Sequence, residues 1–128
     1  MKLSFTIPYP ATKKGRSAWA KQYGFNAVYA GKHWAKRKQD SDYWHSLVKA
    51  ELRRQGLGRK PFDKPVRITF WWNDGLDLDN TAYMRKLIID GMKDIVITDD
   101  DKRYVVGLCD KIHAGNEILV EVAPYDKR

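Results

Sequence analysis

The chain of 128 residues contains a single cysteine, Cys109. One cysteine excludes a framework of intrachain disulfides and any zinc site built on several cysteines. No apolar run approaches the roughly 20 residues that a membrane-spanning helix needs. Residues 1–10 alternate in polarity instead of forming the apolar core of a signal peptide. We therefore expect a protein of the reducing cytoplasm with no membrane partner.

The sequence also lacks the short motifs of several enzyme classes. It contains no glycine-rich phosphate loop and no serine in a nucleophile-elbow motif. The three histidines, His33, His45 and His113, do not have the spacing of metal ligands. No organic cofactor is expected, and carboxylates, lysines and arginines remain as the candidate functional groups.

Positive charge is abundant and unevenly placed. Lys and Arg number 24 and Asp and Glu 16, so the formal net charge is +8. Residues 11–64 hold 14 basic and 4 acidic side chains, a balance of +10, whereas the rest of the chain holds 10 basic and 12 acidic ones, a balance of −2. Such an excess favours a polyanionic partner, nucleic acid first. A solvated, solubilising surface is the alternative, and an anionic membrane fits less well because no amphipathic stripe is present.

Hydrophobic patterning predicts an α+β fold in a single domain, residues 1–128. We expect a small mixed or mainly antiparallel sheet with two helices packed on it. The sequence predicts strands at 3–7, 66–72, 104–108 and 117–122. The last two are close enough along the chain for an antiparallel hairpin.

Two helices are predicted from capping residues and apolar spacing. The first begins near Asp40 or Ser41 and ends at Gly56, and the second runs from about Asp79 to Lys93. Residues 11–39 show no period and are expected to form a long, mobile, basic loop.

Two groups of carboxylates flank the second predicted helix. Asp77 and Asp79, in Asp77-Leu78-Asp79-Asn80, precede it at i, i+2 spacing, which puts them on one side of an extended segment. Their repulsion is relieved by a divalent ion such as Mg²⁺. Asp99, Asp100 and Asp101 follow the helix. The chain either returns this cluster to the first one or leaves two acidic patches at the two ends of the helix. Helix capping and a solvated turn are the alternatives without metal.

Lys86 and Asp90 are four residues apart on the same predicted helix, so they share a face. They form either a surface ion pair, worth a few tenths of a kcal/mol, or a lysine beside a metal site that stabilises charge developing on phosphate. Arg85 competes for that role.

This pattern resembles the RusA family of Holliday-junction endonucleases. The likeness rests on a strand, Asp77-Leu78-Asp79-Asn80, a helix carrying Lys86-x-x-x-Asp90-Gly91, and an Asp-Asp pair. The opening Phe5-Thr6-Ile7-Pro8-Tyr9-Pro10 also resembles the family's first strand and proline turn.

The resemblance implies a homodimeric, Mg²⁺-dependent nuclease of a type common in phages and prophages, which nicks two strands of a four-way DNA junction symmetrically. The implied metal ligands are Asp77, Asp79 and the second Asp of the pair, and the implied catalytic lysine is Lys86. The approach Val96-Ile97-Thr98-Asp99-Asp100 selects Asp100, whereas counting without a gap from Asp90 selects Asp101.

The leading hypothesis is therefore a structure-selective endonuclease of recombination and repair, with Mn²⁺ as a substitute for Mg²⁺. The expected phosphate contacts are Lys13, Lys14, Arg16, Lys36, Arg37 and Lys38. Aromatic residues at 19, 23, 25, 29 and 34 either stack on unpaired bases or pack this segment onto the body. The rival functions are a non-catalytic basic DNA-binding module and a nuclease for forks or flaps.

Overall fold

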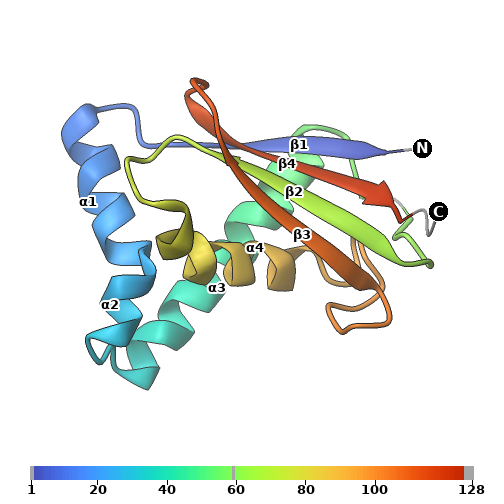
Figure 1. The fold of residues 1–128 in the computed structure, drawn as a ribbon, viewed down its shortest axis with the longest axis horizontal. Coiled ribbons are helices and arrows are strands. Elements are labelled where there is room, and N and C mark those ends of the chain that lie inside the picture. The colour runs from blue at the N-terminus through green and yellow to red at the C-terminus, as the bar shows by residue number, and fades with distance from the viewer. Residues whose placement is uncertain (1, 59, 126–128) are drawn as a thin grey trace.

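A four-stranded sheet lies against a layer of helices in the computed structural model, which describes residues 2–58 and 60–125 (Figure 1). The strands are β1 (Leu3–Pro8), β2 (Val66–Trp72), β3 (Val105–Ile112) and β4 (Glu117–Pro124). The helices are α1 (Lys13–Tyr23), α2 (Phe25–Tyr29), α3 (Trp34–Arg54), the short 3₁₀ helix η1 (Leu78–Thr81) and α4 (Ala82–Met92). The predicted α+β class and mixed sheet are confirmed.

The strands lie in the order β1-β4-β2-β3. Strand β4 is antiparallel to both of its neighbours, whereas β2 and β3 are parallel and are joined through α4. The predicted hairpin of the last two strands is wrong, because β2 lies between them. The short link after β3 crosses the end of β2, where the His113 N–H donates to the Trp72 carbonyl at 3.1 Å.

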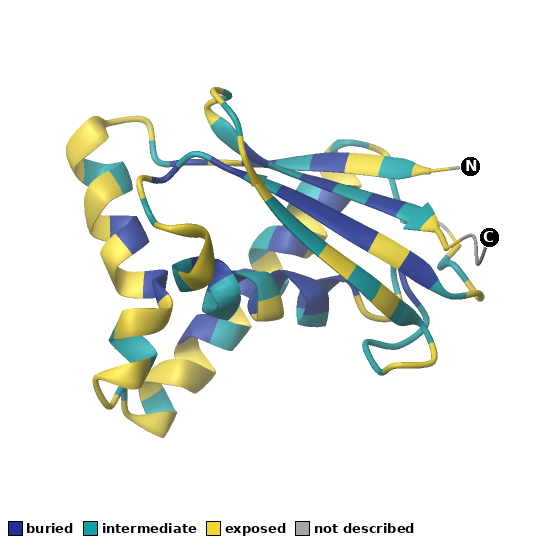
Figure 2. Ribbon diagram, in the orientation of Figure 1, coloured by how far each residue is buried: buried dark blue, intermediate teal, exposed yellow. Residues whose placement is uncertain are grey.

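One face of the sheet is buried against the helices, and the residues alternate accordingly along each central strand (Figure 2). The buried side chains on this face are Phe5, Ile7, Ile68, Phe70, Trp72, Ile118, Val120 and Val122. Strand β3 is an edge strand, and its Leu108 and Ile112 are 48% and 59% exposed. No residue of β3 is buried, as expected of a strand at the edge of a sheet.

Helices α3 and α4 provide the other half of the core. Trp44, Val48 and Leu52 recur every fourth residue on α3 and are fully buried, as the helical period predicts. A Cβ on Gly91 of α4 would lie 3.0 Å from the Val48 Cβ. The glycine therefore allows the two helices to approach closely.

The expected loop over residues 11–39 is wrong, because this segment forms α1, α2 and the beginning of α3. Thr12 begins α1 by accepting a hydrogen bond from the Gly15 N–H at 2.9 Å. The helix is anchored by aromatic contacts, with the Trp19 ring centroid 5.0 Å from that of Trp44 and 5.6 Å from that of Tyr9. Only a few large rings hold the segment, so its sequence carries little apolar period.

The predicted start of the first long helix at Asp40 is also wrong. Helix α3 begins six residues earlier, where the His33 Nδ1 accepts from the Ala35 N–H at 3.2 Å. Asp40 is only 2% exposed and forms an ion pair with Lys32. Asp40 has the side chain of a good helix cap but lies inside α3, because the Lys32 ammonium and the Tyr83 hydroxyl bind its carboxylate there.

This buried ion pair joins three helical elements. The Lys32 Nζ also donates to the Gln22 carbonyl of α1 at 2.8 Å, and the Tyr83 hydroxyl of α4 donates to Asp40 at 2.8 Å. The ammonium lies 5.4 Å and 5.2 Å from the ring centroids of Tyr23 and Tyr83. Burial, followed by the charge of Asp40, raises the pKa of Tyr23 to about 12.

Over the described residues, no helix is both long and apolar enough to span a membrane.

We predict that Lys32→Met lowers the free energy of unfolding by about 3–5 kcal/mol, because it leaves a buried carboxylate without its cation. Lys38→Met is the matched control, since the Lys38–Asp42 pair has side chains 70% and 67% exposed and exposed pairs contribute about 1 kcal/mol or less. Urea unfolding of both variants measures the difference. Equal losses in the two variants would contradict a structural role for the buried pair.

Candidate functional site

The motif Asp77-Leu78-Asp79-Asn80 follows β2 and leads through η1 into α4. Asp77 is extended, and its carbonyl accepts a hydrogen bond from the Asn80 N–H at 2.9 Å. The side chains of Asp77 and Asp79 are both exposed. Thr81 occupies the residue before α4, so the capping role considered for Asp79 and Asn80 is wrong. The two carboxylates point to solvent at the start of the helix.

Asn80 connects this motif to the basic helices. Its Oδ1 accepts from the Asn26 N–H in the first turn of α2 at 2.8 Å. A Cβ on Gly24 would lie 3.1 Å from the Asn80 Nδ2, so the corner between α1 and α2 passes directly against the amide. Sequence reasoning missed this positioning role, because the two partners are 54 residues apart.

The segment between β2 and the motif is braced by Tyr9. The Tyr9 hydroxyl accepts from the Asn73 N–H at 2.8 Å and donates to the Asp74 carboxylate at 3.5 Å. Asp74 also accepts from the Leu76 N–H at 3.0 Å. Burial raises the pKa of the Asp74 carboxyl. These bonds fix the path that leads to Asp77.

A second group of polar residues lies along α4, from its middle towards its carboxyl end. Lys86, Asp90 and Asp100 line a pocket of about 280 Å³ between α4 and the edge strand β3. The Lys86 Nζ lies 3.6 Å from the Asp90 carboxylate, so the predicted i, i+4 pair is present. The side chains of Asp90 and Asp100 line this pocket together, close enough for each to shift the pKa of the other. Asp90 was predicted only as a partner of Lys86, and its approach to Asp100 depends on how the loop after α4 folds back.

The two carboxyl groups shift each other's pKa in opposite directions. Burial and the neighbouring Asp100 raise the pKa of Asp90, although Lys86 opposes the shift. The neighbouring Asp90 lowers the pKa of Asp100. When both groups are ionised, two carboxylates this close repel each other. A divalent cation would relieve the same repulsion, and two carboxylates are suitable oxygen ligands for it.

The three consecutive carboxylates after α4 pair with two different cations. The Lys93 Nζ lies 3.4 Å from Asp99 and 3.8 Å from Asp100. Asp101 pairs with Arg103 at 2.7 Å, and hydrogen bonds from Arg103 lower the pKa of Asp101. Of the three, only Asp100 lines the pocket with Lys86. The geometry thus favours Asp100 over Asp101 as the functional residue.

The parallel arrangement of β2 and β3 keeps the two acidic groups apart. Asp77 and Asp79 follow the carboxyl end of β2, whereas Asp100 precedes the amino end of β3. Helix α4, with 11 residues, is roughly 16 Å long. Figure 1 shows the two connections at opposite ends of α4. Of the two arrangements expected from the sequence, the chain adopts separate acidic patches.

Consistently, within residues 2–58 and 60–125 no group of three or more His, Cys, Asp or Glu side chains lies close enough to hold a metal ion. One copy of the chain therefore does not by itself bring Asp77, Asp79 and Asp100 together.

Arg85 lines the same pocket as Lys86, but its guanidinium forms an ion pair with Asp110 of β3. Asp110 also accepts from the Trp72 Nε1–H at 3.0 Å. By contrast, the Lys86 side chain is 72% exposed. Lys86 is therefore the more available cation of the two.

The predicted phosphate contacts lie on the helical layer. Five of the six are exposed, namely Lys13, Lys14, Lys36, Arg37 and Lys38. Arg16 is only partly exposed, stacks 5.5 Å from the Tyr9 ring centroid and donates to Asn116. Arg16 thus contributes to packing α1 against the sheet.

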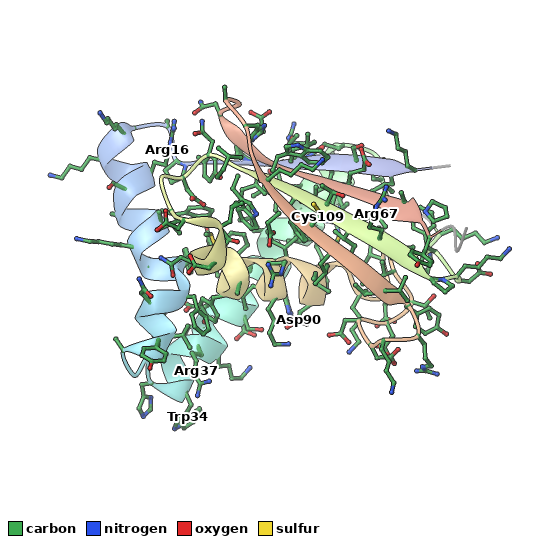
Figure 3. All side chains as sticks on the ribbon, in the orientation of Figure 1. Arg16, Trp34, Arg37, Arg67, Asp90 and Cys109 are labelled. Atoms are coloured by element: carbon green, nitrogen blue, oxygen red, sulfur yellow. The ribbon has the colours of Figure 1, made fainter. Side chains whose placement is uncertain are left out.

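The aromatic residues of this segment divide into two sets. Trp19 and Tyr23 are buried in the core, as the packing alternative predicts. Phe25, Tyr29 and Trp34 are 41%, 84% and 66% exposed, around the turn between α2 and α3. Figure 3 shows Trp34 and Arg37 near each other at this end of α3. Exposed rings among cations suit contact with bases and phosphates.

In comparisons with known proteins, no family model matches the chain, and no curated protein matches it.

We predict that Asp100→Asn weakens Mn²⁺ binding and abolishes cleavage of a four-way junction, whereas Asp101→Asn leaves both nearly unchanged. The reason is that Asp100 faces the Lys86 pocket and Asp101 faces Arg103. Calorimetric titration with Mn²⁺ and a cleavage assay test each variant. If Asp101→Asn were inactive and Asp100→Asn active, the count without a gap from Asp90, which selects Asp101, would be the right one.

Proposed function

We propose that this chain is a Mg²⁺-dependent endonuclease for branched DNA, of the kind that the resemblance to the RusA family implies. The observation that carries the proposal is the contact between Asp90 and Asp100 beside the exposed Lys86. Two carboxylates in contact, with a cation at hand and an extensive basic surface next to them, suit a phosphodiester bound through a divalent ion.

The separation of the acidic groups adds a requirement to this proposal. A site that uses Asp77, Asp79 and Asp100 has to take them from two copies of the chain, since α4 holds them apart within one. A two-fold dimer can bring the start of α4 in one copy to the end of α4 in the other, and its symmetry produces two equivalent sites. Two such sites suit the symmetric nicking of a four-way junction.

Each group has a distinct part in this arrangement. Asp77, Asp79 and Asp100 would hold Mg²⁺, which when bound supplies Lewis acidity and an activated water for in-line attack on phosphorus. Asp90 lies beside Asp100 in the same pocket and adds a carboxylate to this group. Lys86 lies where its ammonium can stabilise charge that grows on the phosphate. The exposed cations of α1 and α3 bind the flanking phosphates and make affinity dependent on salt.

A non-catalytic DNA-binding module is the second candidate. It is favoured by the lack of a three-carboxylate group within the described part of a single chain, and it needs only the basic helices. Labelled four-way junction, fork and linear duplex, incubated with and without Mg²⁺, separate the two functions. The nuclease produces nicks that need Mg²⁺ and prefer a branched substrate, whereas the binder produces none.

A mixing experiment tests whether two copies share the site. We predict that Asp79→Asn and Asp100→Asn are each inactive alone and that a refolded equimolar mixture recovers cleavage. Half of the dimers are then mixed, and each holds one site with both carboxylates intact, so about a quarter of the wild-type sites return.

The control is an equimolar mixture of Asp77→Asn with Asp79→Asn. These two carboxylates belong to the same copy, so each site of every dimer has a defect and activity should stay absent. A first mixture that remains inactive, although the wild type cuts, would place all the ligands in one copy and overturn the shared site.

We also predict that Lys86→Ala lowers the single-turnover cleavage rate by roughly 10²–10³-fold with little change in junction affinity. Arg85→Ala should instead act mainly on stability, because Asp110 loses its ion pair. Rates at saturating enzyme and thermal unfolding of both variants provide the measurement. If Lys86→Ala cut at the wild-type rate while a folded Arg85→Ala cut much more slowly, Arg85 and not Lys86 would be the residue that stabilises charge on the phosphate.

A further inference from the structure

A second pocket adjoins the one that contains Asp100. It has a volume of about 460 Å³ and lies between α2, α3 and α4, within the size range of sites for small organic groups. Lys86 and Asp90 line both pockets and form the wall between them. Whatever occupies the second pocket therefore lies next to the candidate catalytic groups.

The lining of this pocket combines apolar surface with positive charge. Phe25 and Val28 of α2 and Leu87 of α4 provide apolar surface, and Arg37 provides a cation in addition to Lys86. Figure 3 shows Arg37 on α3 and Asp90 on α4, both in the helical layer. The combination fits a ligand with an aromatic, hydrogen-bonding body and an anionic group.

The surrounding chain favours an anionic ligand that is part of a polyanion. Residues 1–39 contain nine Lys or Arg and no Asp or Glu. Phe25 itself is 41% exposed, with its ring centroid 6.4 Å from that of Tyr29, which is 84% exposed. Nucleobases stack on exposed aromatic rings of this kind, and the surrounding cations bind the phosphates of the same strand.

We propose that this pocket binds one unpaired nucleotide at the branch point of the DNA, with its base against Phe25, Val28 and Leu87 and its phosphate between Arg37 and Lys86. The inference rests on the proposed function and adds to it a basis for choosing where the DNA is cut. A base held here places the adjoining phosphate beside Asp100. Ser41 and Asp90 supply polar groups for the edge of the base.

The test is a cycle that combines changes in the pocket with changes in the DNA. The probes are an intact four-way junction and junctions that carry one abasic site at each nucleotide flanking the branch point in turn. Dissociation constants are measured in EDTA at fixed salt, so cleavage does not enter. For wild-type protein, we expect one abasic position to weaken binding by roughly 5- to 150-fold, the range found for stacking of a single base.

Phe25→Ala should weaken binding of the intact junction by a similar factor and should no longer distinguish it from that abasic junction. Val28→Phe, which fills the pocket, should behave in the same way. Because Phe25 is exposed and Val28 only partly buried, thermal unfolding should stay close to that of the wild type. The proposal would be overturned if the protein change and the abasic site each weakened binding by the same factor whether or not the other change was present.

Trp34→Ala is the matched control, because Trp34 is an exposed ring on the same basic surface but outside the pocket lining. It should keep the full difference between intact and abasic junctions. Loss of that difference in Trp34→Ala and its retention in Phe25→Ala would place the base on the start of α3 and overturn the pocket assignment.

This outcome is distinct from a failure of the proposed function. If the chain does not cut DNA, Mg²⁺ produces no nicks while the coupling in EDTA persists. If the pocket assignment fails, the coupling is absent while Mg²⁺-dependent nicking persists.

Discussion

Strands β2 and β3 run parallel, and this pairing determines where the candidate functional groups lie. A parallel pair needs a crossover connection, here supplied by η1 and α4. The crossover separates residues that leave β2 from residues that enter β3 by the length of a helix. Asp77 and Asp79 therefore lie at one end of α4 and Asp100 at the other. An antiparallel pairing of the same strands would have placed both groups at one edge of the sheet.

The basic helices are held to this frame by polar contacts. The buried Lys32–Asp40 pair with the Tyr83 hydroxyl, and the Asn80 contact with α2, both end on η1 or α4. Apolar packing alone tolerates sliding of one helix on another, whereas hydrogen-bonded charges have one geometry. The surface proposed to bind DNA is thus fixed relative to the carboxylates. Arg37 and Lys86, from two different helices, can then line one pocket.

Local signals in the sequence predicted the strands and the core of the long helices well. Alternation located β2 and β4, and the spacing of Trp44, Val48 and Leu52 located the central part of α3. The prediction failed where a few long-range contacts replace a period, as in α1, where Trp19 and Tyr23 bind to rings that are distant in the sequence.

The candidate site shows the same division. The i, i+4 pair of Lys86 and Asp90 was predictable because it depends only on helix geometry. The contact between Asp90 and Asp100 depends on the loop after α4, and the contact of Asn80 with Asn26 depends on how α2 packs against η1. The separation of the two acidic groups depends on strand order. That order was missed, because residues 105–112 and 117–124 are adjacent along the chain but are separated in the sheet by β2.

The sheet order also has a consequence for biosynthesis. Within the described residues, the partner of β1 in the sheet is β4, from Leu3 opposite Val122 to Pro8 opposite Glu117. As the chain leaves the ribosome, β1 emerges well before β4, and the edge that pairs with β4 stays open until then. Until then Phe5 and Ile7 belong to an open strand, which is the kind of segment that chaperones bind and that pairs wrongly between nascent chains.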